Sequence, residues 1–166
     1  MKTPKQLLAI LLFWGTAAVG NSEAMAQTAM NSVYVELFGQ NSFFTFNYDR
    51  MIGNRFGLRT GIGMSGLDGT DGIIVPITAN YLLGDDHKFE FDAGLVYENG
   101  TWQRGTQDIH PILSVGYRYQ PTAGGFMIRA AVDAVWYAER VIGAVTTYDN
   151  NPGLQPGISL SVGYAF

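Results

Sequence analysis

A catalytic serine needs a base such as histidine beside it, because the serine hydroxyl acts as a nucleophile only when a base takes its proton. The chain contains two histidines, His87 and His110, and no cysteine. Ser114 follows His110 at a spacing of four, which places the two side chains well apart along an extended strand. His87 falls in a stretch that is expected to form a turn. The residue pattern therefore predicts no catalytic residues.

Acidic and glycine-rich stretches are the next candidates, because they can hold cations or phosphate groups. The stretch 68–72 reads Asp-Gly-Thr-Asp-Gly, but it lacks the full ligand series and the distal glutamate of an EF-hand. Gly57, Gly61 and Gly63 alternate inside a predicted strand, where they are expected to relieve crowding and not to form a phosphate loop. We predict no metal site and no cofactor.

Alternation of apolar and polar residues with a period of two recurs along the chain, and it predicts strands instead of amphipathic helices. The alternating segments are about ten residues long and are separated by turn residues, which is typical of a transmembrane barrel. The predicted strands span residues 32–38, 43–51, 55–64, 73–83, 88–97, 110–119, 126–136 and 157–166. Pro76 should mark a bulge or a strand edge, because proline cannot donate to the ladder. The prediction is an all-β fold, an eight-stranded antiparallel up-and-down transmembrane barrel.

Connections between these segments alternate in length. Those after the second, fourth and sixth strands are short, whereas those after the third, fifth and seventh are long. Outer-membrane barrels have short periplasmic turns and long external loops. Both ends of the barrel chain are therefore expected on the periplasmic side.

The polar face of the strands is expected to line the interior. A soluble barrel would carry many lysines and glutamates outside, whereas these strands carry Gly, Ser, Thr, Asn and isolated charges. Aromatic residues of the apolar face would then form girdles at the two membrane interfaces. The periplasmic girdle would contain Tyr48, Phe56, Tyr81, Phe89, Tyr117, Tyr119, Phe126, Tyr164 and Phe166, and the outer one Phe44, Tyr97 and Trp136. The alternative is a secreted soluble barrel of the calycin kind.

Eight charged residues fall on the predicted inner face, and Ser114 falls there too. They are Glu36, Asp49, Arg59, Glu90, Asp92, Arg118, Arg129 and Asp133. The lumen of an eight-stranded barrel is just wide enough for side chains to fill it. Buried charges must be paired, so the three arginines are expected to bridge the surrounding carboxylates in a structural ion network. A proton path or a gated pore is the alternative.

Residues 1–26 have the three regions of a signal peptide. Lys2 and Lys5 precede an apolar run, 7–14, which is too short for a membrane-spanning helix, and Ala24-Met25-Ala26 resembles a cleavage site. We predict cleavage after Ala26 and a barrel domain over residues 27–166. The barrel domain holds eight basic and thirteen acidic residues, a net charge of about −5. This charge argues against nucleic acid as a partner.

The closing residues Gly163-Tyr164-Ala165-Phe166 and the eight-strand plan resemble small outer-membrane barrels of the OmpX and OmpA-transmembrane type. The stretches 33–39 and 46–50 are similar to uncharacterised outer-membrane barrel proteins of Bacteroidota. The resemblance implies location in the bacterial outer membrane, contact with its lipid and lipopolysaccharide, and insertion by the barrel assembly machinery. Tyr164 and Phe166 would be the assembly signal.

We expect a barrel without enzymatic activity that has an envelope-structural or surface-interaction role through its external loops, with an unknown surface ligand. The loop around Trp102 and the stretch 148–153 would form the binding surface. One alternative is a lipid A deacylase or acyltransferase. The loop aspartates Asp68, Asp71, Asp108 and Asp149 have no convincing histidine partner for that chemistry. The other alternative is a narrow pore for small solutes.

Overall fold

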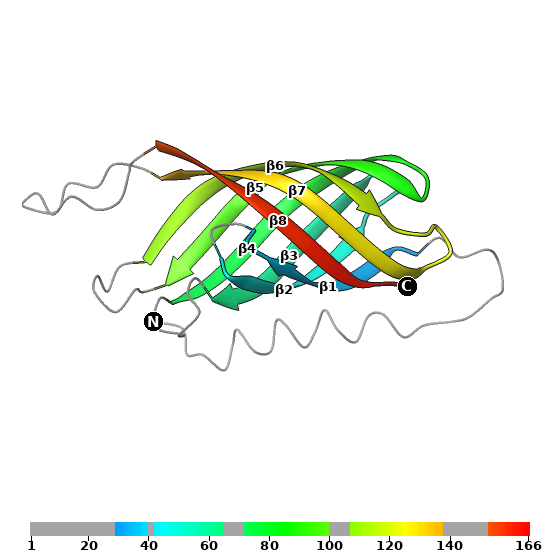
Figure 1. Cartoon of the computed structure of the whole chain (residues 1–166), viewed down its shortest axis with the longest axis horizontal. Helices are drawn as coiled ribbons and strands as arrows, with labels where there is room; N and C mark the ends of the chain where they lie inside the picture. The colour runs from blue at the N-terminus through cyan, green and yellow to red at the C-terminus, as the bar shows by residue number, and fades with distance from the viewer. Residues whose placement is uncertain (1–28, 40–41, 65–71, 100–106, 138–152) are drawn as a thin grey trace, which may run out of the picture.

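Eight strands form a closed antiparallel barrel in the computed structural model of the chain (Figure 1). The structure describes residues 29–39, 42–64, 72–99, 107–137 and 153–166. The strands are β1 (Asn31–Leu37), β2 (Phe44–Met51), β3 (Phe56–Met64), β4 (Ile73–Gly84), β5 (His87–Asn99), β6 (Gln107–Tyr119), β7 (Gly125–Tyr137) and β8 (Gly153–Ala165). The predicted fold class is confirmed. No helix in these ranges is long and apolar enough to cross a membrane. The predicted signal peptide lies outside the described residues.

The register of the strands fixes their tilt. A path along directly paired residues from Ser32 on β1 reaches Gln155 on β8 after one turn of the barrel. The path passes through Asp49, Arg59, Thr78, Gly94, Ile112 and Val135. Ser32 itself pairs with Ala165, so the stagger around the barrel is the ten residues between positions 155 and 165. For eight strands this stagger requires a tilt of about 40°.

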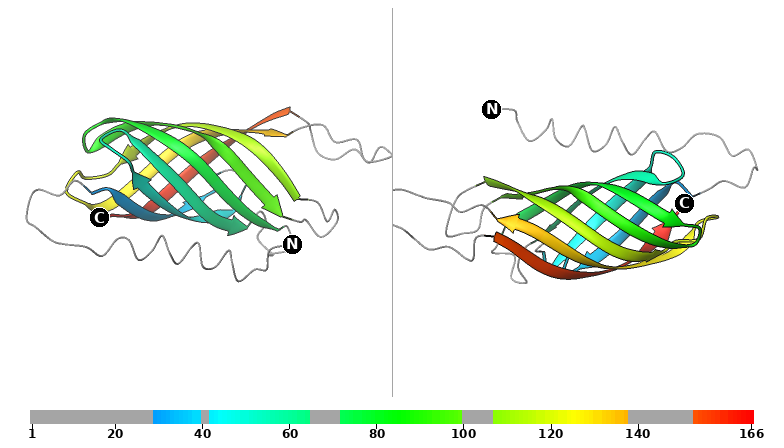
Figure 2. Two further views of the ribbon diagram at one scale, coloured as in Figure 1. Left: turned by 180° about the vertical axis from the view of Figure 1, so that it is seen from behind. Right: turned by 90° about the horizontal axis from the view of Figure 1, so that it is seen from above.

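The wall of the barrel is uneven in height. β1, β2 and β3 contain seven to nine residues, whereas β4 to β8 contain 12 or 13. Figure 2 shows β7 and β8, in orange and red, lying side by side up to the end away from the C-terminus. The predicted ends at residues 97, 110 and 157 were wrong, because β5, β6 and β8 continue to Asn99, Gln107 and Gly153. Backbone pairing prolongs these strands beyond the alternation that predicted them, as the pair between Asn99 and Gln107 shows.

Pro76 causes neither the predicted bulge nor a strand edge. It lies inside β4 and pairs directly with Val96 of β5. On the other side, the pairs Thr60–Ile77 and Gly63–Ile74 are separated by the same number of residues on both strands, so the β3–β4 register is unbroken. Because proline has no N–H to donate, direct pairing between β3 and β4 is interrupted at this point. Neither strand contains an extra residue there.

The outer face of the barrel is apolar. Phe46, Ile77, Leu113, Val132 and Ile158 are each more than half exposed, with fractions between 58 and 67%. Near the ends of the strands where the C-terminus lies, each strand from β2 to β8 contributes at least one outward aromatic residue. These are Tyr48, Phe56, Tyr81, Phe89, Tyr117, Phe126 and Tyr164. So large an exposed apolar surface fits contact with lipid and not with water.

Candidate functional site

All eight charged residues that the sequence placed on the inner face are buried in the lumen, with exposed fractions of 5% or less. They alternate with outward apolar residues on β1, β2, β3, β5, β6 and β7. Burial of this many charges requires close pairing, because each unpaired charge costs several kcal/mol. The contacts of the three arginines therefore define the site.

Arg59 on β3 is the first centre of the network. Its guanidinium contacts Glu90 and lies 3.1 Å from Asp92 and 3.5 Å from Asp49. It also lies over the ring of Tyr34, 5.4 Å from the ring centroid. Arg59 thus connects carboxylates of β2 and β5 with an aromatic ring of β1.

Arg118 on β6 approaches the same carboxylates from another part of the wall. Its Nη1 donates to Asp49 at 2.5 Å, and its Nη2 donates to the Ser32 hydroxyl at 2.7 Å. Nη1 also lies 3.8 Å from Glu90. Asn80 adds a hydrogen bond of 2.9 Å to Asp49. Asp49 therefore accepts bonds from β4 and β6 through the lumen.

Arg129 on β7 is the third centre. Its guanidinium lies 2.7 Å from Glu36, 2.7 Å from Asp92 and 3.2 Å from Glu90. Because Glu90 and Asp92 also contact Arg59, seven of the eight residues form one continuous network. Asp133 is the exception, since neither of its oxygens has a hydrogen-bond partner within the described chain.

Small residues make room for these long side chains. Gly61 lies beside Asn47, and Gly163 lies beside Tyr34 and the Val33 carbonyl, where a Cβ atom at either glycine would collide. The strand glycines of the inner face therefore relieve crowding, as the sequence indicated. Glycine in place of a larger residue lets the lumen hold arginine and tyrosine side chains at ordinary packing density.

Two inward apolar layers bracket the network, and the sequence analysis missed both. Toward the end away from the C-terminus, Ile74, Val96, Ile112 and Val135 form a cluster that is at most 3% exposed, with Tyr137 packed against it. Toward the end where the C-terminus lies, the inward side chains of Met51, Leu82 and Met127 are buried. Ile74 and Val96 sit in continuous apolar runs, 73–75 and 95–97, in which alternation cannot distinguish the inward residue.

The two histidines do not pair with Ser114. The Ser114 hydroxyl accepts a hydrogen bond of 2.9 Å from Arg129 inside the lumen. His110 lies 3.9 Å from Glu98, and its ring lies tilted against the Tyr137 ring with a centroid distance of 4.3 Å. Four residues of strand separate His110 from Ser114, about 13 Å. The arrangement therefore does not supply the nucleophile–base contact that acyl chemistry needs.

His87 was predicted in a turn, but it is the first residue of β5. Its ring contacts the Tyr117 hydroxyl and lies tilted against the Tyr119 ring at a centroid distance of 5.1 Å. Pairing of His87 with Tyr119 extends the β5–β6 ladder to this position. His87 thus has a packing role at the end of the barrel where the C-terminus lies.

Among the described residues, no group of three or more His, Asp, Glu or Cys side chains could hold a metal ion. Most of the acidic stretch 68–72, the loop around Trp102 and the stretch 148–152 lie outside the described residues.

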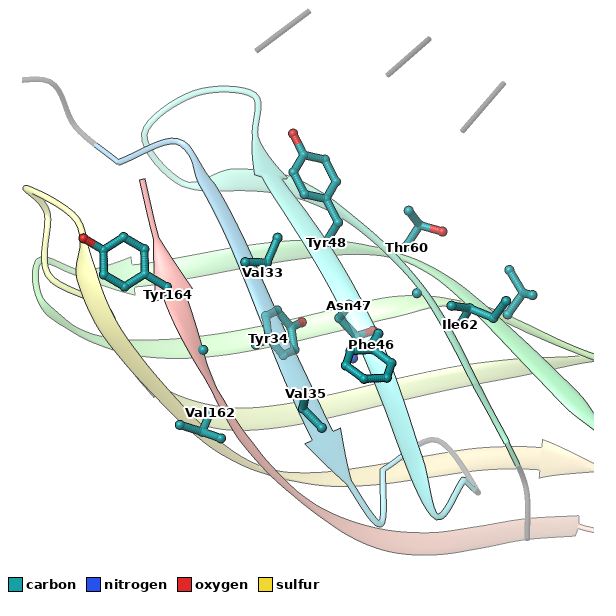
Figure 3. Close-up of a pocket in the computed structure, with 13 residues that line it drawn as sticks. Val33, Tyr34, Val35, Phe46, Asn47, Tyr48, Thr60, Ile62, Val162 and Tyr164 are labelled. Carbon is teal, nitrogen blue, oxygen red and sulfur yellow. The ribbon is translucent and has the colours of Figure 1, made fainter. Parts of the chain in front are cut away.

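A groove of about 660 Å³ lies over β1, β2, β3 and β8 (Figure 3). The outward side chains Val33, Val35, Phe46, Ile62 and Val162 contribute to its lining. Tyr34 and Asn47 also line it, although they belong to the inner face. The groove belongs to the apolar outer wall and contains no charged side chain among its lining residues.

Comparison with known proteins adds information on the fold. No family model matches the chain, and no curated protein sequence matches it. Among solved structures, the chain is similar to the N-terminal beta-barrel domain of Pseudomonas aeruginosa OprF, with a TM-score of 0.57 and 21% sequence identity. The alignment covers 82% of this chain and 98% of that chain. The protein therefore has the fold of the OprF barrel domain.

Proposed function

We propose that the chain is a non-enzymatic barrel of the bacterial outer membrane that presents its external loops at the cell surface, with an envelope-structural or surface-interaction role. The observation that carries this proposal is the filled lumen. Three arginines bridge four carboxylates across it, and apolar side chains lie toward both ends. A barrel filled in this way is a rigid support for loops and leaves little room for solutes.

The apolar outer face supports the location in a membrane. Its half-exposed Phe, Leu, Ile and Val side chains would be costly in water but match the hydrocarbon of a bilayer. Processing of residues 1–26 near Ala26 and recognition of Tyr164 and Phe166 by the assembly machinery belong to the same proposal. Lipid and lipopolysaccharide would surround the wall.

Conductance in planar bilayers tests the filled lumen. The refolded chain should insert, as flotation with lipid vesicles would show, and should leave the bilayer electrically silent. Regular conductance steps from the inserted wild-type protein would contradict the proposal and favour the narrow pore.

The surface role can be tested by removing loops without altering the wall. Tyr137 pairs directly with Gly153, and Asn99 pairs directly with Gln107. Residues 138–152 or 100–106 can therefore each be replaced by a tight turn between strands that are already adjacent. Loss of surface binding or an altered envelope phenotype, with normal barrel folding, is expected for at least one variant. Unchanged binding and phenotype in both would contradict the surface role.

A further inference from the structure

Asp133 is a buried carboxylate that has no ion-pair partner among the described residues. It is 1% exposed, and both of its oxygens lack hydrogen-bond partners among the described residues. The nearest arginine on its own strand face, Arg129, is engaged by Glu36, Asp92 and Glu90. Lys88, at the periplasmic end of β5, donates to the Gln120 carbonyl. An isolated carboxylate in such surroundings requires a positive partner, because the cost of leaving it unpaired is several kcal/mol.

Open space lies next to this carboxylate. Gly157 pairs with Asp133 in the β7–β8 register and belongs to the inner face of β8. Among the described residues, a Cβ atom at Gly157 would meet only the Phe38 carbonyl oxygen at 3.8 Å and the Asp133 Cβ at 4.0 Å, both ordinary contact distances. By contrast, a Cβ at Gly61 or Gly163 would collide with its neighbours. Within the described part of the chain, the lumen is therefore tightly packed at Gly61 and Gly163 and more loosely packed beside Asp133.

Further oxygen atoms lie on the same side of the lumen. Phe38 has a φ angle of 62°, a conformation that side-chain-bearing residues seldom adopt, and its carbonyl oxygen lies at the open space. Glu36 interacts electrostatically with Asp133, and its Oε1 has no hydrogen-bond partner among the described residues. That oxygen lies near Gly39, which also adjoins the Ser159 side chain. Carboxylate and carbonyl oxygens together are the ligands that hard cations prefer.

We propose that Asp133, Glu36 and the Phe38 carbonyl hold a calcium-class divalent cation in the space beside Gly157. Only two carboxylates take part, which agrees with the absence of a three-acid group among the described residues. Water completes the coordination, as is usual for calcium with its six to eight oxygen ligands. The cation neutralises Asp133 and joins the outer end of β1 to β7 and β8.

Calcium binding to the refolded whole chain tests this site. After treatment with a chelator, the folded protein in detergent should take up one Ca²⁺ per chain in equilibrium dialysis, and its thermal unfolding midpoint should rise. Asp133→Asn should weaken Ca²⁺ binding by about tenfold or more. Without calcium, Asp133→Asn should unfold at a higher temperature than the wild type, because it removes the unpaired charge.

Two further variants separate the site from general charge effects. Gly157→Val fills the space while it keeps both carboxylates, and it should also lose calcium binding. Asp86→Asn removes an exposed acid in the β4–β5 turn and should leave binding unchanged. The proposal is overturned if the wild type binds no calcium, or if K⁺ at equal ionic strength raises its thermal unfolding midpoint as much as calcium does. It is also overturned if acid pH raises this midpoint and calcium does not. The last result would assign the counter-charge to a proton.

Discussion

Arg129 of β7 and Glu36 of β1 form an ion pair of 2.7 Å that passes across the inner face of β8, the strand between them. Two β8 hydroxyls take part in the contact. Ser159 accepts a bond of 3.0 Å from Arg129, and Ser161 donates one of 3.2 Å to Glu36. The β1–β8 seam, where the two ends of the sheet meet, is therefore fastened from inside by side chains as well as by its backbone ladder.

Replacement of Arg118 by alanine should strongly destabilise the barrel. Asp49 would lose its 2.5 Å partner, and the charge left inside the lumen should cost about 3–5 kcal/mol of the free energy of unfolding. Urea unfolding in lipid vesicles measures this change. Arg55→Ala is a matched control, because Arg55 is exposed and makes a long hydrogen bond of 3.5 Å to Tyr81. Equal stability of the two variants would contradict the structural role of the network.

Gly163→Ala should disturb the closing seam. The added methyl group would collide with the Val33 carbonyl and the Tyr34 side chain, and overpacking of this kind costs about 1–3 kcal/mol. A lower yield of folded protein and a lower free energy of unfolding are expected. Gly53→Ala is the control, since a Cβ atom there meets no atom of the described residues within 4 Å. The account of lumen crowding would be wrong if Gly163→Ala refolded as well as this control.

The β4–β5 turn should give the barrel a small acid-sensitive contribution to stability. The Thr122 hydroxyl and backbone N–H each donate to Asp86 at 2.7 Å, and these bonds lower the pKa of Asp86 below its ordinary value of 3.8. A carboxyl with a lowered folded pKa stabilises the protein above its unfolded pKa, and this stabilisation is lost as pH falls through the folded value. The wild type should therefore unfold at a higher temperature than Asp86→Asn at pH 7. An equal difference in strong acid would contradict this assignment.

The C-terminal aromatic residues should matter for assembly in cells more than for the folded state. Tyr164 and Phe166 are 57 and 50% exposed, so their rings add little to packing. Phe166 also exchanges two backbone hydrogen bonds with Asn31, which alanine substitution preserves. We expect Tyr164→Ala/Phe166→Ala to refold normally in detergent but to reach the outer membrane poorly. Normal membrane levels of the variant would refute the assembly signal.

The sequence predicted the strand count and the inner charged face because both depend on local alternation. Glu36, Glu90 and Asp133 each alternate with apolar neighbours, so their shared face follows from the strand geometry. The partner of each arginine could not be predicted, since it depends on the ten-residue stagger around the whole barrel. The inward Ile74 and Val96 were missed because apolar neighbours flank them on both sides. The isolation of Asp133 likewise becomes visible only when the three arginines are placed.

A double-mutant cycle on Arg129 and Glu36 tests the central claim, that a charged network crosses the lumen and holds the barrel closed. The free energy of unfolding would be measured for wild type, Arg129→Met, Glu36→Gln and the double variant under the same conditions. Because the pair is buried and lies at 2.7 Å, the two substitutions should couple by more than about 1 kcal/mol. Additive effects, within about 0.5 kcal/mol, would contradict the network.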